Sequence, residues 1–305
     1  MALATPFFYA YLPAMKFNLL IPLTLLTFPV LAQHQQLRRQ IDSIAHAANG
    51  KVGVAICLLE TMDTLTCQNH AQYVMHSVMK FPIAMAVLSE VDKGHLAIDQ
   101  RIHIQKADLA KTYSPLRDKY PEGNIDISIK ELLSYMVSQS DNDACDILLK
   151  QIGGPKFVND YIASLNIKPF SIRATEAQMA AAWPVQYTNW CEPYTQVQLL
   201  RLLYKGAALS KTSNDYLWQI MLATSTGQKR LKGGLPPGTH VAHKTGTSNT
   251  NDKGLTAATN DVGIIILPNG KHLAVAVFIT DSTGDETTRE AVIAAIAKAA
   301  FREFL

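Results

Sequence analysis

The sequence carries little net charge and has no concentrated patch of one sign. Its 305 residues include 28 Lys and Arg against 25 Asp and Glu, a formal net charge of +3 with the histidines neutral. Proteins that bind polyanions usually cluster their basic residues, and no Lys/Arg cluster is present here. The composition therefore argues against a nucleic-acid partner.

Cysteine is also scarce, with four residues in the chain. Neither these nor the nine histidines fall at the spacing of a zinc site, so we expect no metal and no cofactor. Cys57 and Cys67 flank a turn centred near residues 62–63 and can face each other across a hairpin, while Cys145 with Cys191 is a second possible pairing. Geometry decides whether either bridge forms, and the sequence leaves both open.

Long apolar runs are missing, apart from one short stretch near the N-terminus. This stretch, Leu19 to Val30, follows Lys16 and ends in a small residue, Ala32, before Gln33. A basic flank, a short apolar core and a small final residue are typical of a secretory signal peptide, and the run is short for a membrane span. We expect a signal peptide over 1–32 and a periplasmic or secreted protein, with a membrane anchor as the alternative.

Hydrophobic periodicity predicts β-rich ends around a helical centre. Apolar residues recur at helical spacing over 33–48 and 286–304, and the segment 77–222 is mostly helical in pattern. β-like runs are found at both ends of the chain, over 52–59, 65–68, 241–245, 257–267 and 273–280.

Strands joined by tight turns must be antiparallel, so these runs predict one antiparallel sheet built from both ends of the chain. The expected fold class is α/β (α+β): a five-stranded antiparallel sheet flanked by terminal helices, plus an all-helical domain. The sheet domain would comprise 33–76 and 223–305, and the helical domain 77–222. A ligand site is expected in the crevice between them.

Three short segments carry residues suited to acyl-transfer chemistry. In Ser77-Val78-Met79-Lys80, a hydroxyl and an ammonium share one helix face. Ser140-Asp141-Asn142 follows a helical stretch and offers a second hydroxyl and an amide. Lys244-Thr245-Gly246-Thr247 closes a strand that can pair with a substrate amide. Taken singly, each has an ordinary alternative, respectively a solvated helix face, a capping turn and a strand end.

Together and in this order, the three segments resemble the S-x-x-K, S-D-N and K-T-G elements of the penicillin-recognising serine enzymes, over essentially the whole mature chain. The resemblance implies that Ser77 is acylated, Lys80 transfers a proton and Ser140 protonates the lactam nitrogen. It assigns substrate binding to Asn142, Lys244, Thr245, Gly246 and Thr247. The backbone N–H groups of Ser77 and Thr247 would form the oxyanion hole.

Glu176 lies 34 residues after Asn142 and 68 before Lys244. This placement is similar to that of the loop glutamate that holds the deacylating water in class A β-lactamases. A solvated loop carboxylate is the alternative. The neighbouring sequence resembles the PER and VEB extended-spectrum subgroup, which implies hydrolysis of penicillins and cephalosporins, including bulky oxyimino-cephalosporins, and hence antibiotic resistance.

The chain also departs from the usual class A pattern. Ala180 stands where many relatives have an Asn that shares the water. Asn189 replaces the Asp that commonly pairs with the residue matching Arg173, so the usual salt bridge is missing and the loop is expected to be wider or differently folded. Val262 occupies the place of a carboxylate-binding Arg.

Two further residues are candidates for substrate binding. Arg230 can replace the missing carboxylate-binding charge, with a surface role as its alternative. Tyr113 fits an aromatic gate at the mouth of the site, with simple packing as its alternative. Neither His76 nor Ser248 is Cys, which excludes the bridge typical of class A carbapenemases and disfavours strong carbapenemase activity.

The sequence thus predicts a serine β-lactamase that acts as a monomer on a small β-lactam substrate. A D,D-peptidase or penicillin-binding protein is the first alternative, and a non-enzymatic β-lactam sensor domain is the second. Glu176 disfavours the peptidase. Sensors usually adjoin a membrane segment and a signalling region, and neither pattern is visible in the sequence.

Overall fold

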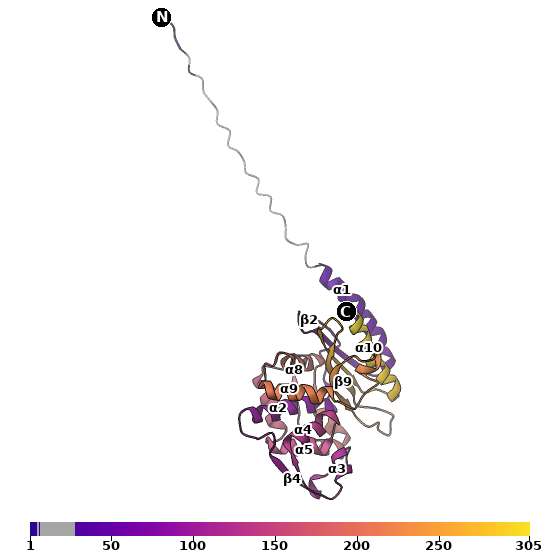
Figure 1. Cartoon of the computed structure of the whole chain (residues 1–305). Coiled ribbons are helices and arrows are strands. Elements are labelled where there is room, and N and C mark those ends of the chain that lie inside the picture. The colour runs from indigo at the N-terminus through magenta and orange to yellow at the C-terminus, as the bar shows by residue number, and fades with distance from the viewer. Residues whose placement is uncertain (5, 7–27) are drawn as a thin grey trace.

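The computed structural model describes residues 1–4, 6 and 28–305 (Figure 1). The apolar run assigned to a signal peptide, Leu19 to Val30, falls largely outside the described residues, so its cleavage stays a prediction. Within the described ranges, no helix is both long and apolar enough to cross a membrane.

Strands from both ends of the chain form one five-stranded antiparallel sheet in the order β2-β1-β10-β9-β8. They are β1 (Lys51–Leu58), β2 (Asp63–Cys67), β8 (Val241–Thr247), β9 (Thr259–Ile266) and β10 (His272–Thr280). The predicted sheet is therefore confirmed. β8 lies at an edge, so one side of its backbone is free of a neighbouring strand of the sheet.

The two terminal helices, α1 (Phe28–Ala45) and α10 (Glu286–Glu303), lie side by side on one face of the sheet (Figure 1). Successive side chains along a strand point to opposite faces, so β10 contributes side chains to both faces of the sheet. Val275 and Val277 pack in the core beneath the terminal helices, whereas Ala276 and Phe278 belong to the larger core on the helical side.

The chain between β2 and β8 is mostly helical, as expected. Its α-helices are α2 (Lys80–Asp92), α3 (Pro115–Lys119), α4 (Ile129–Ser138), α5 (Asn142–Gln151), α6 (Pro155–Ser164), α7 (Glu176–Ala181), α8 (Pro193–Lys205) and α9 (Lys211–Leu222). Short strands also occur, namely β3 (Tyr73–Val74), β4 (Arg101–Gln105), β5 (Gly123–Ser128), β6 (Phe170–Ser171) and β7 (Trp190–Cys191). The 3-10 helices are η1 (His46–Ala48), η2 (His76–Met79), η3 (Lys106–Asp108), η4 (Trp183–Thr188) and η5 (Leu231–Gly234). The domain boundaries stay a prediction.

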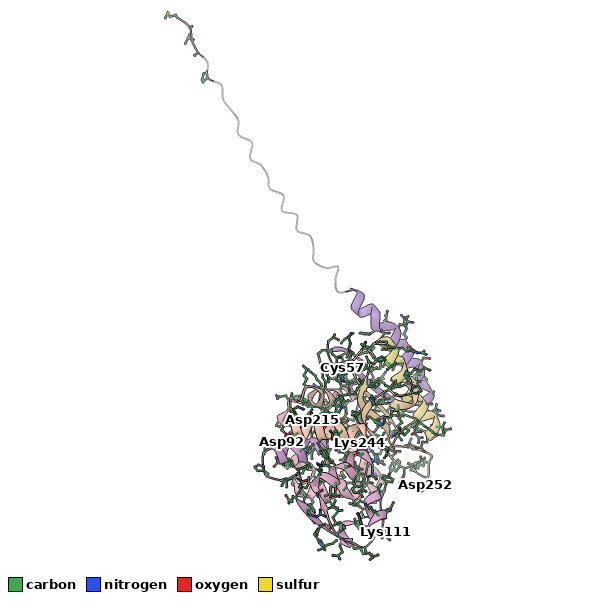
Figure 2. All side chains as sticks on the ribbon, viewed as in Figure 1. Cys57, Asp92, Lys111, Asp215, Lys244 and Asp252 are labelled. Carbon is green, nitrogen blue, oxygen red and sulfur yellow. The ribbon has the colours of Figure 1, made fainter. Side chains whose placement is uncertain are left out.

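The four cysteines are free and buried, so neither expected disulfide forms. In the β1–β2 hairpin, Cys57 pairs with Thr64, and Cys67 pairs with Val54. Cys57, labelled in Figure 2, packs in the core on the helical side, while Cys67 packs in the core beneath the terminal helices. Because the two thiols are on opposite faces of the sheet, the Cys57–Cys67 prediction is wrong.

Candidate active site

Ser77 lies in η2, the short 3-10 helix that leads into α2. The sequence predicted a helix beginning at Ser77 itself, whereas α2 begins at Lys80. Residues three apart eclipse each other in a 3-10 turn, so the two side chains still share one face. Lys80 Nζ lies 2.9 Å from Ser77 Oγ.

The side chain of Lys80 is fully buried and surrounded by oxygen atoms. Besides Ser77 Oγ, its Nζ lies 2.7 Å from the carbonyl oxygen of Ser140, 2.5 Å from Asn142 Oδ1 and 2.9 Å from Glu176 Oε1. A buried ammonium is tolerated only with such partners. Lys80 therefore joins three segments that are far apart in the sequence.

Ser140 and Asp141 lie in the connection between α4 and α5, and Asn142 is the first residue of α5. The capping interpretation holds for Asp141, whose carboxylate caps the first turn of α5. Ser140 and Asn142 instead contact Lys80. Ser140 Oγ also accepts a hydrogen bond from Lys244 Nζ at 2.8 Å, which connects this segment with β8.

Edge strand β8 packs directly on η2, the turn that carries the proposed nucleophile Ser77 and is called the nucleophile turn below. Gly246 allows this approach, because an added Cβ would lie 2.4 Å from the carbonyl oxygen of Met75. Lys244, on the same strand and labelled in Figure 2, is fully buried. Desolvation, and secondly the nearby Lys80 ammonium, lower the pKa of Lys244 well below its usual range.

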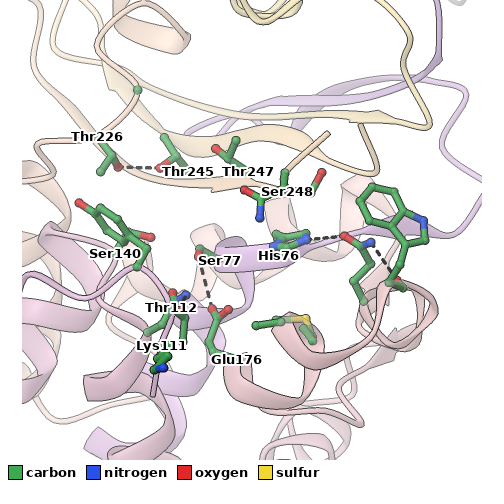
Figure 3. A pocket seen from close by; sticks show the side chains of 18 of the residues that line it. His76, Ser77, Lys111, Thr112, Ser140, Glu176, Thr226, Thr245, Thr247 and Ser248 are labelled. Atoms are coloured by element: carbon green, nitrogen blue, oxygen red, sulfur yellow. Dashed lines mark hydrogen bonds between the residues drawn. The ribbon is translucent and has the colours of Figure 1, made fainter. Parts of the chain in front are cut away.

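Glu176 begins α7, and only 4% of its surface is exposed. Its Oε1 lies 2.9 Å from Lys80 Nζ and 3.3 Å from Ser77 Oγ (Figure 3). The alternative that this carboxylate is merely solvated is therefore wrong. The carboxylate lies directly beside the hydroxyl of the proposed nucleophile.

Asp146, which no sequence motif marked, fixes the backbone at the start of α7. Its two carboxylate oxygens accept the N–H groups of Glu176 and Ala177 at 2.8 and 2.9 Å. Asp146 follows Asn142 by one helical turn on α5, so helical spacing from a candidate residue was the signal that could have found it. Burial raises the pKa of Asp146 to about 6.

An amide closes the loop that carries Glu176, in place of a salt bridge. Asn189 Oδ1 accepts the N–H groups of Arg173 and Ala174 at 2.7 and 3.0 Å. Its Nδ2 donates to the Ala174 carbonyl at 2.8 Å and contacts the sulfur atoms of Met79 and Met179 at 3.2 and 3.3 Å. Asn189 is fully buried, and the Arg173 side chain is exposed.

Arg230 is 3% exposed, so its surface alternative is wrong. Its Nε pairs with Glu290 Oε1 at 3.1 Å, and Nη2 donates to Thr247 Oγ1 at 2.8 Å. Nη1 donates to the carbonyl oxygens of Gly246 and Asn260 at 3.2 and 3.0 Å. The guanidinium is thus held immediately behind the end of β8.

Ser77, Ser140 and Glu176 line a cleft of about 720 Å³. Figure 3 places Thr226 and Thr245, whose hydroxyl oxygens are 2.6 Å apart, on one side of Ser77 and His76 on the other. Tyr113 also lines the cleft and is 56% exposed, as a residue at its mouth should be. Among the described residues, no group of three or more His, Cys, Asp or Glu is placed to hold a metal ion.

Comparisons with known proteins give one consistent answer. The beta-lactamase enzyme family matches residues 36–304. The chain is 46% identical to Beta-lactamase VEB-1 of Pseudomonas aeruginosa over 277 residues, covering 90% of this chain and 92% of that protein. It is 42% identical to the extended-spectrum beta-lactamase PER-1 of the same species, over 90% of both chains.

Solved structures show the same relationship. A beta-lactamase from Chitinophaga pinensis matches with a TM-score of 0.87 and 50% identity, over 88% of this chain and all of that one. The TLA-3 extended-spectrum beta-lactamase matches with a TM-score of 0.87 and 47% identity, over 88% and 98% of the two chains.

Proposed function

Because the chain belongs to the beta-lactamase enzyme family, as a class A β-lactamase similar to the PER and VEB enzymes, we propose that it opens β-lactam rings through an acyl-enzyme on Ser77. One observation carries this proposal: Ser77 Oγ lies 2.9 Å from Lys80 Nζ and 3.3 Å from Glu176 Oε1 in one buried cluster. A serine hydroxyl needs a base to become a good nucleophile, and two candidate bases are within reach.

In the acylation step, Ser77 Oγ bonds to the lactam carbonyl carbon and gives its proton to the Glu176 carboxylate, or to Lys80 in its neutral amine form. The lactam C–N bond breaks, and the leaving nitrogen takes the proton of the Ser140 hydroxyl. Lys244 Nζ, 2.8 Å from Ser140 Oγ, replaces that proton. The lowered pKa of Lys244 favours this transfer, since it makes the ammonium a stronger acid. Before deacylation, the base that took the Ser77 proton passes it on to restore the Lys244 ammonium, so Glu176 is again a carboxylate.

In the deacylation step, the Glu176 carboxylate takes a proton from a water molecule whose oxygen attacks the ester carbonyl. The ester C–O bond breaks, and Glu176, 3.3 Å from Ser77 Oγ, gives the proton back to that oxygen. Asp146 supports this step by fixing the backbone N–H groups at the start of α7. A penicillin-binding protein lacks such a base and keeps or transfers the acyl group.

The remaining groups bind the substrate. The backbone N–H groups of Ser77 and Thr247 stabilise the oxyanion, and the Asn142 amide binds the amide of the acyl side chain. The substrate carboxylate is bound at the end of β8 by Lys244, Thr245, Thr247 and Arg230, with Gly246 allowing close approach. Tyr113 borders the entrance.

The substrates include penicillins and cephalosporins, among them the bulky oxyimino-cephalosporins. A cleft of about 720 Å³ has room for such a side chain. Two similar proteins, PER-1 and TLA-3, are named extended-spectrum enzymes. We further propose that the chain is exported to the periplasm after removal of residues 1–32 and acts there as a monomer.

Replacing the proposed base tests this function. Glu176→Ala should be acylated by a cephalosporin but deacylate slowly, so intact-mass measurement should find the acyl adduct on most molecules. Ser77→Ala is the matched control and should show no adduct. Normal steady-state turnover by Glu176→Ala would exclude Glu176 as the base, and an adduct on Ser77→Ala would exclude the nucleophile. A stoichiometric burst without turnover in the unmodified protein would favour the peptidase or sensor alternatives.

A further inference from the structure

A hydrogen bond joins the nucleophile turn to η4, which lies 110 residues further along the chain. His76 Nε2 lies 2.7 Å from Gln186 Oε1, and both side chains line the cleft (Figure 3). Gln186 is 3% exposed, and its Nε2 donates to the carbonyl oxygen of Trp183 at 2.9 Å. None of the catalytic steps above uses this bond.

The network defines its own donors and acceptors. Because Gln186 Nε2 donates to Trp183, Gln186 Oε1 is the atom that faces His76, and an amide oxygen can only accept. His76 Nε2 must therefore carry a proton. Desolvation lowers the pKa of His76, against an opposing effect of the Glu176 charge, so the neutral imidazole with its proton on Nε2 is the stable form.

This hydrogen bond joins the residue before the nucleophile to a segment that forms one wall of the cleft. His76 directly precedes the nucleophile and has a left-handed backbone, with φ of 45°. Gln186 belongs to η4, whose first residue Trp183 lines the cleft together with Met179 and Ala180. A backbone hydrogen bond from Met75 N to Asn189 O, 3.0 Å long, is a second link between the same two segments.

The wall formed by η4 lies where the acyl side chain of a β-lactam must extend. The carboxylate and the acylamino group are attached at opposite ends of the bicyclic β-lactam nucleus. Figure 3 places Thr226 and Thr245 on one side of Ser77 and His76 on the other. A substrate whose carboxylate binds beside the two threonines would therefore extend its acyl side chain past Ser77 toward His76. The hydrogen bond between His76 and Gln186 therefore lies at the acyl-side-chain end.

We infer that His76 is a positioning residue for bulky substrates: through its hydrogen bond to Gln186 it fixes the η4 wall against the nucleophile turn, so that large acyl side chains find a preformed surface. The inference rests on the proposed function and names a determinant of its specificity. Compact acyl side chains do not reach this wall and do not depend on the bond. Loss of the His76–Gln186 hydrogen bond should therefore lower activity on substrates with large acyl side chains more than on substrates with small ones.

Four variants test this inference on a matched pair of substrates, an oxyimino-cephalosporin and a penicillin with a small acyl group. Gln186→Met keeps the volume and leaves the left-handed residue untouched, but it removes both the acceptor for His76 and the donor to the Trp183 carbonyl, whereas His76→Ala removes the first of these bonds alone. Gln186→Met should raise KM and lower kcat/KM for the cephalosporin about fivefold, as expected for one net hydrogen bond, with less than about twofold change for the penicillin. His76→Ala should act the same way, and the double variant should cost no more than either single one.

His76→Gln should restore most of the cephalosporin activity, because its amide is again a donor at the reach of Nε2. Equal losses on both substrates, additive losses in the double variant, or no rescue by glutamine would overturn the inference. Circular-dichroism melting of each variant shows whether folding is intact; if His76→Ala does not fold, the Gln186→Met comparison decides. These outcomes are distinct from failure of the proposed function, which Ser77→Ala and Glu176→Ala test.

Discussion

Replacing Asn189 by Asp should destabilise the protein strongly, although Asp resembles Asn in size and is common at this position in class A enzymes. In this chain the Nδ2 group donates to the Ala174 carbonyl at 2.8 Å. A carboxylate oxygen in its place would face that carbonyl oxygen with no proton between them. The new charge would keep the N–H groups of Arg173 and Ala174 and the Thr188 hydroxyl, 3.5 Å away, as partners but would gain no cation, because the Arg173 side chain is exposed.

The expected cost follows from these contacts. An orphaned buried carbonyl costs about 1–3 kcal/mol, and an uncompensated buried charge raises the total to about 3–5 kcal/mol. Since folded domains are stable by only about 5–15 kcal/mol, this is a large fraction of the whole. Urea unfolding at pH 7.5, followed by tryptophan fluorescence, should show the loss directly.

The loss in Asn189→Asp should also depend on pH. Burial beside a carbonyl raises the folded-state pKa of the new carboxyl above its unfolded value of about 3.9. As pH rises from the unfolded to the folded pKa, the unfolded chain releases its proton first, so the deficit grows and then levels off. Below the unfolded pKa, the protonated carboxyl can donate to the Ala174 carbonyl, and most of the deficit should disappear.

Arg173→Ala is the control for the salt-bridge explanation. Its exposed side chain should contribute within about 0.5 kcal/mol of zero. A cost below about 1 kcal/mol for Asn189→Asp, or an equal cost for Arg173→Ala, would refute the assignment of loop closure to the neutral amide.

Two further predictions concern residues that position catalytic or binding groups. Asp146→Asn can accept through only one oxygen, so kcat/KM should fall about two- to tenfold at neutral pH. The acid-side inflection near the Asp146 pKa of about 6 should vanish from the pH–rate profile, and an unchanged inflection would assign it to another group. Because the folded pKa exceeds the model-peptide value of 3.8, the unmodified protein should also lose stability relative to this variant as pH rises between these values. Arg230→Ala should raise KM for penicillins about tenfold or more with a smaller change in kcat, because the substrate carboxylate is bound in both the ground state and the transition state. A loss confined to kcat would exclude this role for Arg230.

The proposed catalytic segments could be recognised in the sequence because each is a local pattern. Ser77 and Lys80 are separated by one turn, and Lys244 to Thr247 follow one another along a strand. Their convergence came from the family resemblance, and the contacts among Lys80, Ser140 and Lys244 agree with it.

Side-chain contacts between distant segments could not be predicted in this way. His76 and Gln186 are 110 residues apart, and no local periodicity connects them.

The register of the β1–β2 hairpin is a second feature that the sequence did not predict. A turn centred near residues 62–63 would place Cys57 opposite Cys67, but the observed register pairs Cys57 with Thr64. An odd shift in register moves a side chain to the other face of the sheet, so a small error in turn position reversed the disulfide prediction.

The contacts that hold the Glu176 segment also determine which charges lie beside the Glu176 carboxylate. Two of them, the Asn189 amide and the neutral His76–Gln186 pair, carry no net charge. Among the described residues, Lys80 is the one cation that forms an ion pair with Glu176, at 2.9 Å. Coulombic interaction falls with distance and rises in a buried site, so the charge on Lys80 dominates the electrostatic environment of this carboxylate. When Lys80 is the base that takes the Ser77 proton during acylation, the charge beside Glu176 changes by one unit, and this couples the acylation step to the deacylation step that Glu176 performs.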